Sequence, residues 1–196
     1  MRVLLTDPTT ARPALYRRYL RRALYRGCLA GTMSAVSSYL SLNAIVFRRA
    51  EHAALAELTT TFARVFNKAG EQCKKAGIQF GYHNHNFEFR TYDGVVAYDE
   101  LLRLTDPSLV QFELDCFWVT RAGKDPVEYM QKYPGRFPLL HIKDLKAGYP
   151  PTTEDDFKPG PFAEVGQGTI DWKRIFAAAP EGGLKHYFVE QDECER

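Results

Sequence analysis

Residue types that bind divalent metals or transfer protons recur in the C-terminal part of this 196-residue chain, each time at the end of a strand-like segment. The four segments span residues 81–85, 113–115, 140–144 and 187–190, and they supply, in order, His, Asp, His and Glu. Imidazole combined with carboxylate suits Mn, Fe, Co or Zn, whereas a structural zinc site usually includes thiolates. The four strand ends therefore predict a site for one divalent ion.

A divalent ion at such a site has a definite chemistry. It can hold the adjacent hydroxyl and carbonyl oxygens of a sugar, acidify the carbon between them and stabilise the enediolate left by proton removal. A carboxylate beside the ion can act as the general base. Taken singly, a histidine at a strand end is usually a hydrogen-bonded structural residue, and an aspartate there usually caps a turn or helix. Asp115, His141 and Glu190 occupy corresponding places on successive strands, which favours the metal site, while His83 is left open between the two interpretations.

Helices and strands must alternate to bring these strand ends together. Apolar residues recur at spacings of three and four over 51–76, which predicts a helix that Gly77 closes. Asp125, followed by Pro126, and Asp171 stand at the N-cap positions of two later helices. The predicted strands span residues 78–85, 110–117, 137–143 and 186–191, and the later helices 95–104, 125–132 and 172–179.

The alternation of side chains within the strands distinguishes a barrel from an open sheet. In the strand at 110–117, alternate positions from Val110 to Cys116 are apolar and the positions between them are polar. The other strands are also apolar on one face only, and in the last one that face holds Tyr187 and Val189. A doubly wound sheet needs both faces apolar, whereas a barrel of parallel strands can place polar groups inside, near its C-terminal mouth. The pattern therefore favours an α/β barrel.

Charge is distributed unevenly along the chain, although its net value is only +2. Residues 1–50 hold nine arginines and one acid, Asp7, whereas residues 51–196 hold 23 acids against 17 lysines and arginines. The Arg-rich segment has three competing interpretations: an arm for nucleic acid or a membrane surface, an organellar transit peptide, or a leader that is non-native or disordered. We therefore divide the chain into a leader at 1–50 and a domain at 51–196.

Hydropathy and cysteine usage narrow the class of protein. No apolar run reaches the roughly 18 residues that a membrane span needs, so we expect no membrane association and favour the cytoplasm. The four cysteines are scattered, without a C-x-x-C pair, and we interpret them as reduced thiols. Cys116 is predicted to be a buried strand residue.

Longer stretches around the strand ends resemble the sugar phosphate isomerase/epimerase family, which has a xylose isomerase-like TIM barrel. The resemblance covers residues from about 67 to 194 and is specific in the order and spacing of its motifs. The matching stretches are 77–85 with 88–89, 113–118 with 122–126, 135–144, 164–171 and 188–192. The resemblance implies an α/β fold that is a partial (β/α)8 TIM barrel of about the last four βα units, preceded by a non-matching Arg-rich segment.

The resemblance also implies roles for individual residues. Asp115, His141 and Glu190 fall on ligand positions for a divalent metal, which could be Mn, Co, Mg, Fe or Zn, and Glu190 is implied to shuttle the proton. Many relatives have Glu where this chain has His83, so the fourth ligand is either His83 or Glu88. If Glu88 is not a ligand, it is a candidate catalytic residue that contacts the substrate.

Further residues are implied to bind the substrate. His85, Trp118 and Lys143 fall where relatives line the sugar pocket, and Lys143 is also a candidate catalytic residue. Gly166 and Gly168 are implied to form a tight loop over the mouth, although a lone G-x-G is equally an ordinary turn.

A barrel of eight strands needs more chain than the sequence supplies. If these strands are the last four, residues 1–50 cannot provide the first four, because each βα unit needs about 25 residues or more. An open half-barrel exposes two sheet edges. We therefore expect a truncated or frame-disrupted family member that is poorly soluble or forms homo-oligomers.

Four functions compete. The primary prediction is a divalent-metal-dependent sugar (phosphate) isomerase or epimerase that acts on a small sugar through an enediolate by proton transfer. The second is a dehydratase or hydratase acting on a keto-sugar or keto-inositol, because the same enediolate can expel a β-hydroxyl. The third is a DNA-repair endonuclease, since abasic-site nucleases share this fold, but the acidic balance of residues 51–196 argues against a nucleic-acid partner. The fourth is an inactive, truncated family member.

Overall fold

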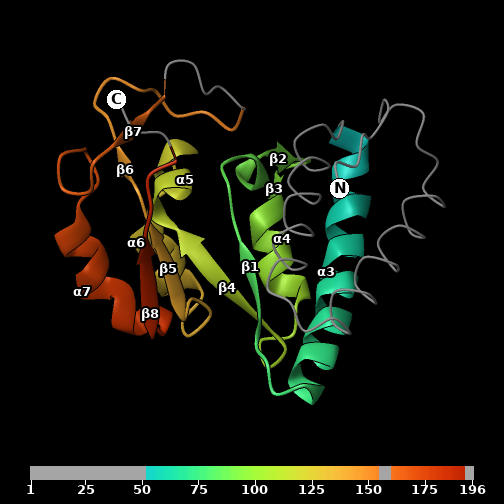
Figure 1. The fold of residues 1–196 in the computed structure, drawn as a ribbon. Coiled ribbons are helices and arrows are strands. Elements are labelled where there is room, and N and C mark those ends of the chain that lie inside the picture. Colours follow the sequence, from blue (N-terminus) through green and yellow to red (C-terminus); the bar gives the residue numbers. More distant parts are fainter. Residues whose placement is uncertain (1–51, 155–159, 193–196) are drawn as a thin grey trace, which may run out of the picture. The chain divides into compact units, whose positions relative to one another are not determined.

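Helices and parallel strands alternate along residues 52–154 and 160–192, the part of the chain that the computed structural model describes (Figure 1). The predictions for the Arg-rich leader at 1–50 lie outside the described residues. The elements are α3 (His52–Lys75), β1 (Phe80–His83), η2 (Phe87–Phe89), β2 (Thr91–Tyr92), β3 (Val95–Val96), α4 (Ala97–Leu104), β4 (Val110–Asp115), α5 (Cys116–Arg121), α6 (Pro126–Lys132), β5 (Leu139–Ile142), β6 (Asp144–Leu145), β7 (Phe162–Ala163), α7 (Trp172–Gly182) and β8 (His186–Val189).

Four of the strands form one parallel sheet, in the order β1-β4-β5-β8. Parallel neighbours end at the same edge, so the C-terminal ends of all four strands meet there. The register pairs His83 with Glu113 and Asp115 with His141, which places the predicted site residues at nearly one level. The predicted parallel sheet with helical crossovers is confirmed.

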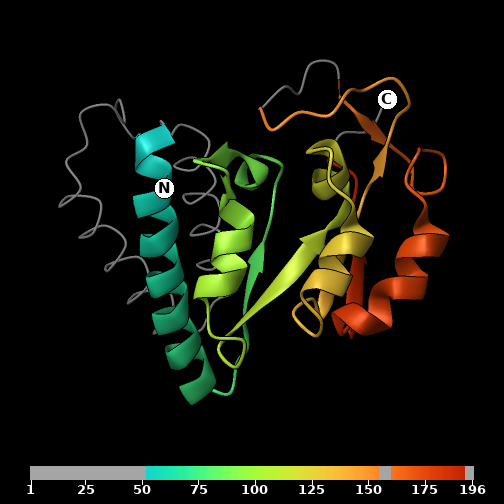
Figure 2. The ribbon, with the colours of Figure 1, turned by 180° about the vertical axis from the view of Figure 1, so that it is seen from behind.

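Helix α3 forms where the apolar spacing predicts it and packs against α4 and β1 (Figures 1 and 2). Phe62 and Phe66 on its apolar face are fully buried, and the Phe66 ring lies 4.9 Å from that of Tyr82 on β1. Gly77 adopts a φ of 71° just after the helix, a conformation that glycine adopts without strain. On the β8 side of the sheet, α6 packs against α7 (Figure 1).

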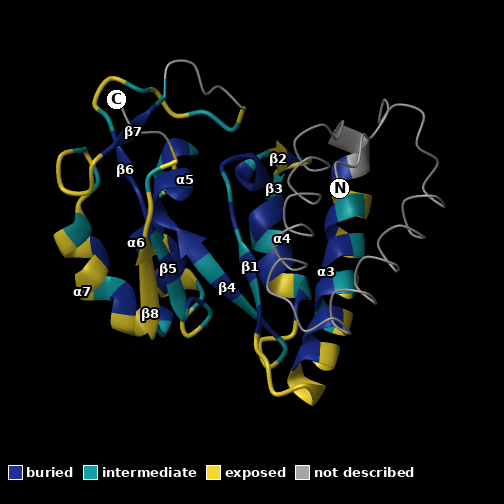
Figure 3. Ribbon diagram, in the orientation of Figure 1, coloured by how far each residue is buried: buried dark blue, intermediate teal, exposed yellow. Residues whose placement is uncertain are grey.

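Side-chain alternation in β4 agrees with the prediction, but β8 does not follow it. Val110, Phe112 and Leu114 are fully buried. In contrast, Tyr187 and Val189 are 55% and 63% exposed, so the expectation of a buried apolar face on β8 is wrong (Figure 3). The physical reason is position, because β8 is an outer strand that pairs only with β5 among the described strands.

Several predicted boundaries shift by a few residues. The strand predicted at 110–117 ends at Asp115, and Cys116 is buried in the first turn of α5 rather than in a strand. The turn forms because the Asp115 carboxylate accepts a hydrogen bond from the backbone N–H of Trp118 at 3.0 Å. Asp125 and Asp171 cap α6 and α7 as predicted. Among the described residues, no helix combines the length and apolar character needed to cross a bilayer.

Candidate metal centre

Three donor atoms converge at the C-terminal edge of the sheet, from His83, Asp115 and His141. His83 Nε2 lies 3.1 Å from Asp115 Oδ2 and 2.9 Å from His141 Nδ1, and the third separation, His141 Nδ1 to Asp115 Oδ2, is 3.5 Å. Ligands at about 2.0–2.2 Å from one ion lie roughly 3 Å from each other, so these spacings fit a single divalent ion. The nature of the donors, two imidazoles and a carboxylate, agrees with that assignment.

Each donor is carried by a different strand end. His83 is the last residue of β1, Asp115 the last of β4, and His141 the penultimate residue of β5. The two carboxylate oxygens of Asp115 make different contacts. Oδ1 caps α5 by accepting a hydrogen bond from the Trp118 N–H, and Oδ2 faces the histidines. The cap therefore helps to set the direction of the ligand oxygen.

The three groups shift one another's proton affinity. Burial opposes ionisation of Asp115, yet the hydrogen bond and charge of His83 and the charge of Lys143 hold its pKa below the usual value. Burial also disfavours the charged form of His83, but Asp115 outweighs it and raises the His83 pKa. The pKa of His141 is lowered, first by burial and then by the nearby Lys143 and His83. Asp115 as a carboxylate and His141 as a neutral imidazole are in the state that a metal ligand requires, whereas His83, which Asp115 favours in its protonated form, must release a proton when an ion binds.

Lys143 links the three donors to two further acids. Its ammonium, only 4% exposed, lies 2.9 Å from Glu190, 2.9 Å from Asp192 and 3.5 Å from Asp115 Oδ2. Glu190 lies 2.9 Å from Nε2 of His141, on the opposite side of the ring from the donor group, so its role as a fourth ligand stays a prediction. Asp192 was not predicted to act in the site. Its position two residues after Glu190 was the available signal.

Aromatic rings flank the donor group. The His85 ring lies 5.0 Å from that of His83, 5.6 Å from that of Trp118, and stacks on Phe87 at 5.2 Å. Trp118 belongs to a buried apolar cluster with Phe117, Leu145 and Phe162. The structure thus brings His85 and Trp118 together beside His83, where the sequence predicts the substrate pocket.

Comparison with known proteins identifies the family of the chain. The sequence model of the xylose isomerase-like TIM barrel family matches residues 31–193. The chain belongs to that family. The match begins within the segment that we set apart as the leader, and it agrees with the predicted partial TIM barrel.

Individual relatives of this xylose isomerase-like chain are about twice as long. It is 28% identical over 141 residues to the inosose dehydratase of Clostridium perfringens, covering 68% of this chain and 46% of that protein. A sugar phosphate isomerase/epimerase structure from Parabacteroides distasonis is 35% identical, with a TM-score of 0.60, covering 71% of this chain and 46% of that one. The fold also resembles that of the IolI protein with a bound zinc atom, at 17% identity and a TM-score of 0.54, covering 69% of this chain and 48% of that one. The chain thus spans about half the length of the curated relatives that it matches.

Glu88 of this xylose isomerase-like chain lies outside the group of three donors. Its side chain is buried, accepts a hydrogen bond from the Tyr82 hydroxyl at 2.5 Å, and accepts another from the His85 backbone N–H at 2.9 Å. Burial raises the pKa of Glu88 to about 7. In this position Glu88 stabilises the backbone at His85. Its roles as a ligand or a catalytic group stay predictions.

Gly166 and Gly168 wrap around the side chain of Asp144. Their backbone N–H groups donate to Asp144 Oδ2 at 2.8 and 3.3 Å. A Cβ on Gly168 would overlap the Asp144 carboxylate, which explains the glycine there. The predicted tight loop is present, while its contact with a substrate stays a prediction.

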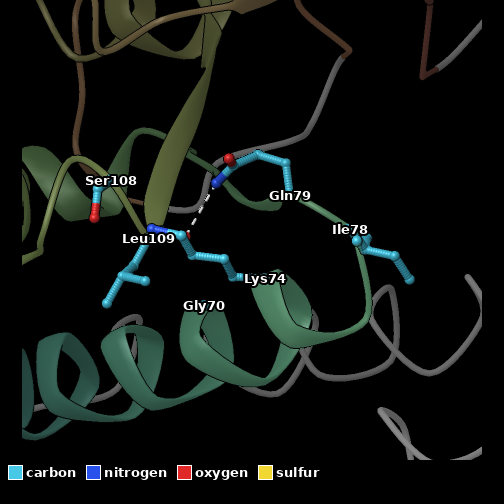
Figure 4. Close-up of a pocket in the computed structure, with 7 residues that line it drawn as sticks. Gly70, Lys74, Ile78, Gln79, Ser108 and Leu109 are labelled. Carbon is cyan, nitrogen blue, oxygen red and sulfur yellow. Dashed lines mark hydrogen bonds between the residues drawn. The ribbon is translucent and has the colours of Figure 1, made fainter.

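A separate hollow lies beside the N-terminal ends of β1 and β4, away from the donor group (Figure 4). Its volume is about 290 Å³, and the residues that line it are Gly70, Lys74, Gly77, Ile78, Gln79, Ser108 and Leu109. Active sites of TIM barrels gather at the C-terminal ends of the strands, so we place the functional site at the donor group instead.

Proposed function

We propose that this chain carries the metal site of a dehydratase acting on a keto-inositol or a related keto-sugar. The observation that carries the proposal is the pairing of the three metal donors with an ion pair between Lys143 and Glu190, 2.9 Å apart. The inosose dehydratases among the relatives support the same reaction. Elimination of water needs a base for the carbon-bound proton and an acid for the departing hydroxyl, and the site holds a candidate for each.

His83, Asp115 and His141 would hold the divalent ion. When bound, such an ion acts as a Lewis acid that polarises a carbonyl oxygen and offsets the charge left by proton removal. The IolI protein, which shares this fold, holds zinc. His85 and Trp118 would orient a polyhydroxy ring beside the ligands.

Glu190 is suited to remove the proton. Its hydrogen bond to Lys143 holds its pKa below the usual value, so it is a carboxylate at neutral pH. Lys143 is the candidate acid for the departing hydroxyl because of its position, 3.5 Å from Asp115 Oδ2. Burial opposes its charge, but Asp115, Asp192 and Glu190 outweigh burial and raise the Lys143 pKa, so the side chain is protonated before the reaction. The two groups thus divide the acid and base roles.

The isomerase or epimerase reaction is the second candidate. The Parabacteroides distasonis structure, which is 35% identical, favours it. A single carboxylate that removes a proton and returns it to the neighbouring carbon suffices for isomerisation. In that reaction Glu190 is essential and Lys143 is needed only to bind the substrate.

The test uses the purified chain loaded with Mn²⁺ or Co²⁺ and supplied with an inosose in D₂O. Dehydration creates an ultraviolet absorbance, and isomerisation changes the sugar without it. Glu190→Gln should abolish both deuterium incorporation and product formation. Lys143→Met should keep deuterium exchange and lose dehydration. Lys132→Met is the matched control, because Lys132 also forms an ion pair, with Asp99 at 2.7 Å, but its side chain is 57% exposed and lies outside the donor group.

The outcomes separate the candidates. A new ultraviolet absorbance in the parent chain that is absent in Glu190→Gln and Lys143→Met supports the dehydratase. Deuterium exchange with a new ketose and no absorbance replaces it by the isomerase. No exchange in metal-loaded chain contradicts both.

A further inference from the structure

Asn84 lies between His83 and His85 in the sequence, and its side chain points into the protein interior instead of towards the metal donors. It is fully buried, while His83 and His85 on either side are partly exposed. Its Oδ1 accepts a hydrogen bond from the backbone N–H of Asp115 at 3.0 Å, and its Nδ2 donates to the Asp115 carbonyl at 3.4 Å. The Tyr98 hydroxyl also donates to Oδ1, at 3.4 Å. One side chain therefore joins both backbone groups of a metal donor.

The bridge lies just beyond the paired part of the two strands. The register between β1 and β4 ends with His83 opposite Glu113, so Asp115 lies two residues past the last pair. A carboxamide has one acceptor and one donor group, as a peptide unit does. The Asn84 side chain thus takes the place of a strand backbone where β1 no longer supplies one, and it pairs the buried Asp115 N–H.

We propose that Asn84 is a positioning residue of the metal centre, whose carboxamide ties the ends of β1 and β4 and so orients His83, His85 and Asp115. The inference deepens the proposed function, because it assumes that this centre binds a divalent ion. It concerns ion binding alone and holds for either reaction.

The geometry shows how one amide can act on three side chains. Side chains alternate along an extended chain, so holding Asn84 towards the interior turns both neighbouring histidines towards the mouth. On the other strand Asp115 is held at its N–H and carbonyl by Asn84 and at Oδ1 by the Trp118 N–H, which leaves Oδ2 aimed at His83. Groups that orient metal ligands typically change metal affinity about 10- to 100-fold when removed.

The test is the Asn84→Ala variant of the full chain, with Asn67→Ala as its matched control. Asn67 makes the same kind of bridge away from the site: Nδ2 donates to the Leu104 carbonyl at 3.1 Å, and Oδ1 accepts from the Asp106 N–H at 2.7 Å. The dissociation constants for Mn²⁺ and Co²⁺ are measured by competition with a chromophoric chelator, and the melting temperature is measured without metal. Both variants should melt lower than the parent chain. Only Asn84→Ala should weaken metal binding, by about 10- to 100-fold.

The results distinguish this inference from the proposed function. A parent chain that binds neither ion overturns the metal centre, and the positioning role with it. A parent chain that binds metal, together with an Asn84→Ala variant that binds within twofold of it, overturns the positioning role alone. If Asn84→Ala does not give a cooperative melt, Asn84→Ser replaces it, because serine leaves room for a bridging water. At least threefold weaker binding is then expected, and unchanged affinity contradicts the proposal.

Discussion

Asp115 and Glu88 are both buried carboxyl groups near the same sheet edge, yet their surroundings push them in opposite directions. Asp115 faces the mouth, where His83 and Lys143 lower its pKa. Glu88 lies behind the mouth against the Tyr82 hydroxyl, and burial raises its pKa to about 7. Burial alone favours the neutral acid, and cationic neighbours reverse that preference. The difference favours the ionised form of Asp115, which suits a cation, and the neutral form of Glu88.

The largest expected effect is on metal affinity and comes from neutralising the charge of Asp115. Asp115→Asn keeps the shape and can still cap α5, but it removes the charge that an ion needs. Metal affinity should fall about 1,000-fold, or ~4 kcal/mol, by chelator competition. Asp125→Asn is the matched control, because Asp125 caps α6 in the same way and lies outside the donor group. Equal losses of metal affinity in the two variants would show that the charge of Asp115 has no special part in binding the ion.

Glu88 should make stability depend on pH in the direction opposite to a paired carboxylate. Its pKa is about 7 in the folded chain against 4.5 ordinarily, so the folded state binds the proton more tightly. The resulting stabilisation is complete below about pH 4.5 and is lost as pH rises through 7, amounting to about 3 kcal/mol. Urea unfolding of the parent chain and Glu88→Gln across this range measures it.

The comparison between parent and variant isolates Glu88 from other titrating groups. Their difference in unfolding free energy should change steadily between pH 4.5 and 8. Glu100→Gln provides the control, because Glu100 pairs with Arg103 on the exposed side of α4. A difference that does not vary with pH would show that Glu88 is not the buried acid described here.

Asp144 adds a third buried carboxylate to the comparison, one surrounded by N–H donors instead of cations. It accepts from the backbone N–H groups of four residues and from Trp172 Nε1 at 3.0 Å. Asp144→Asn places an amide donor against these donors, so we expect a loss of about 2 kcal/mol in thermal or urea unfolding. Metal affinity should stay within twofold of the parent chain.

The control for Asp144 is Asp171→Asn, since asparagine caps a helix nearly as well as aspartate. A large loss of metal affinity in Asp144→Asn would show that the glycine loop acts on the donor group directly. That result would make the glycine loop part of the metal site.

Sequence patterns predicted the parts of the fold that depend on local periodicity. The apolar spacing that defines α3, the stop at Gly77 and the caps at Asp125 and Asp171 are all visible along the chain. The parallel strands followed from the alternation of elements. The exposure of β8 could not be predicted in this way, because it depends on which strands lie beside it in space.

The site was predictable to the extent that its residues end strands. His83, Asp115 and His141 were named from their types and places, and the structure brings them together. The contacts of Asn84 and the orientation of the Glu88 side chain depend on which residues the fold brings together. Asn84 bonds across 31 residues of sequence, and no local pattern shows that distance.

The most direct test of the metal centre is pulsed electron paramagnetic resonance of the chain titrated with Mn²⁺. We expect one bound ion per chain, with nitrogen modulation of the electron spin echo from the imidazoles of His83 and His141, and loss of that modulation in the double variant His83→Ala, His141→Ala. Stoichiometric Mn²⁺ without nitrogen modulation, or no bound ion at all, would contradict it.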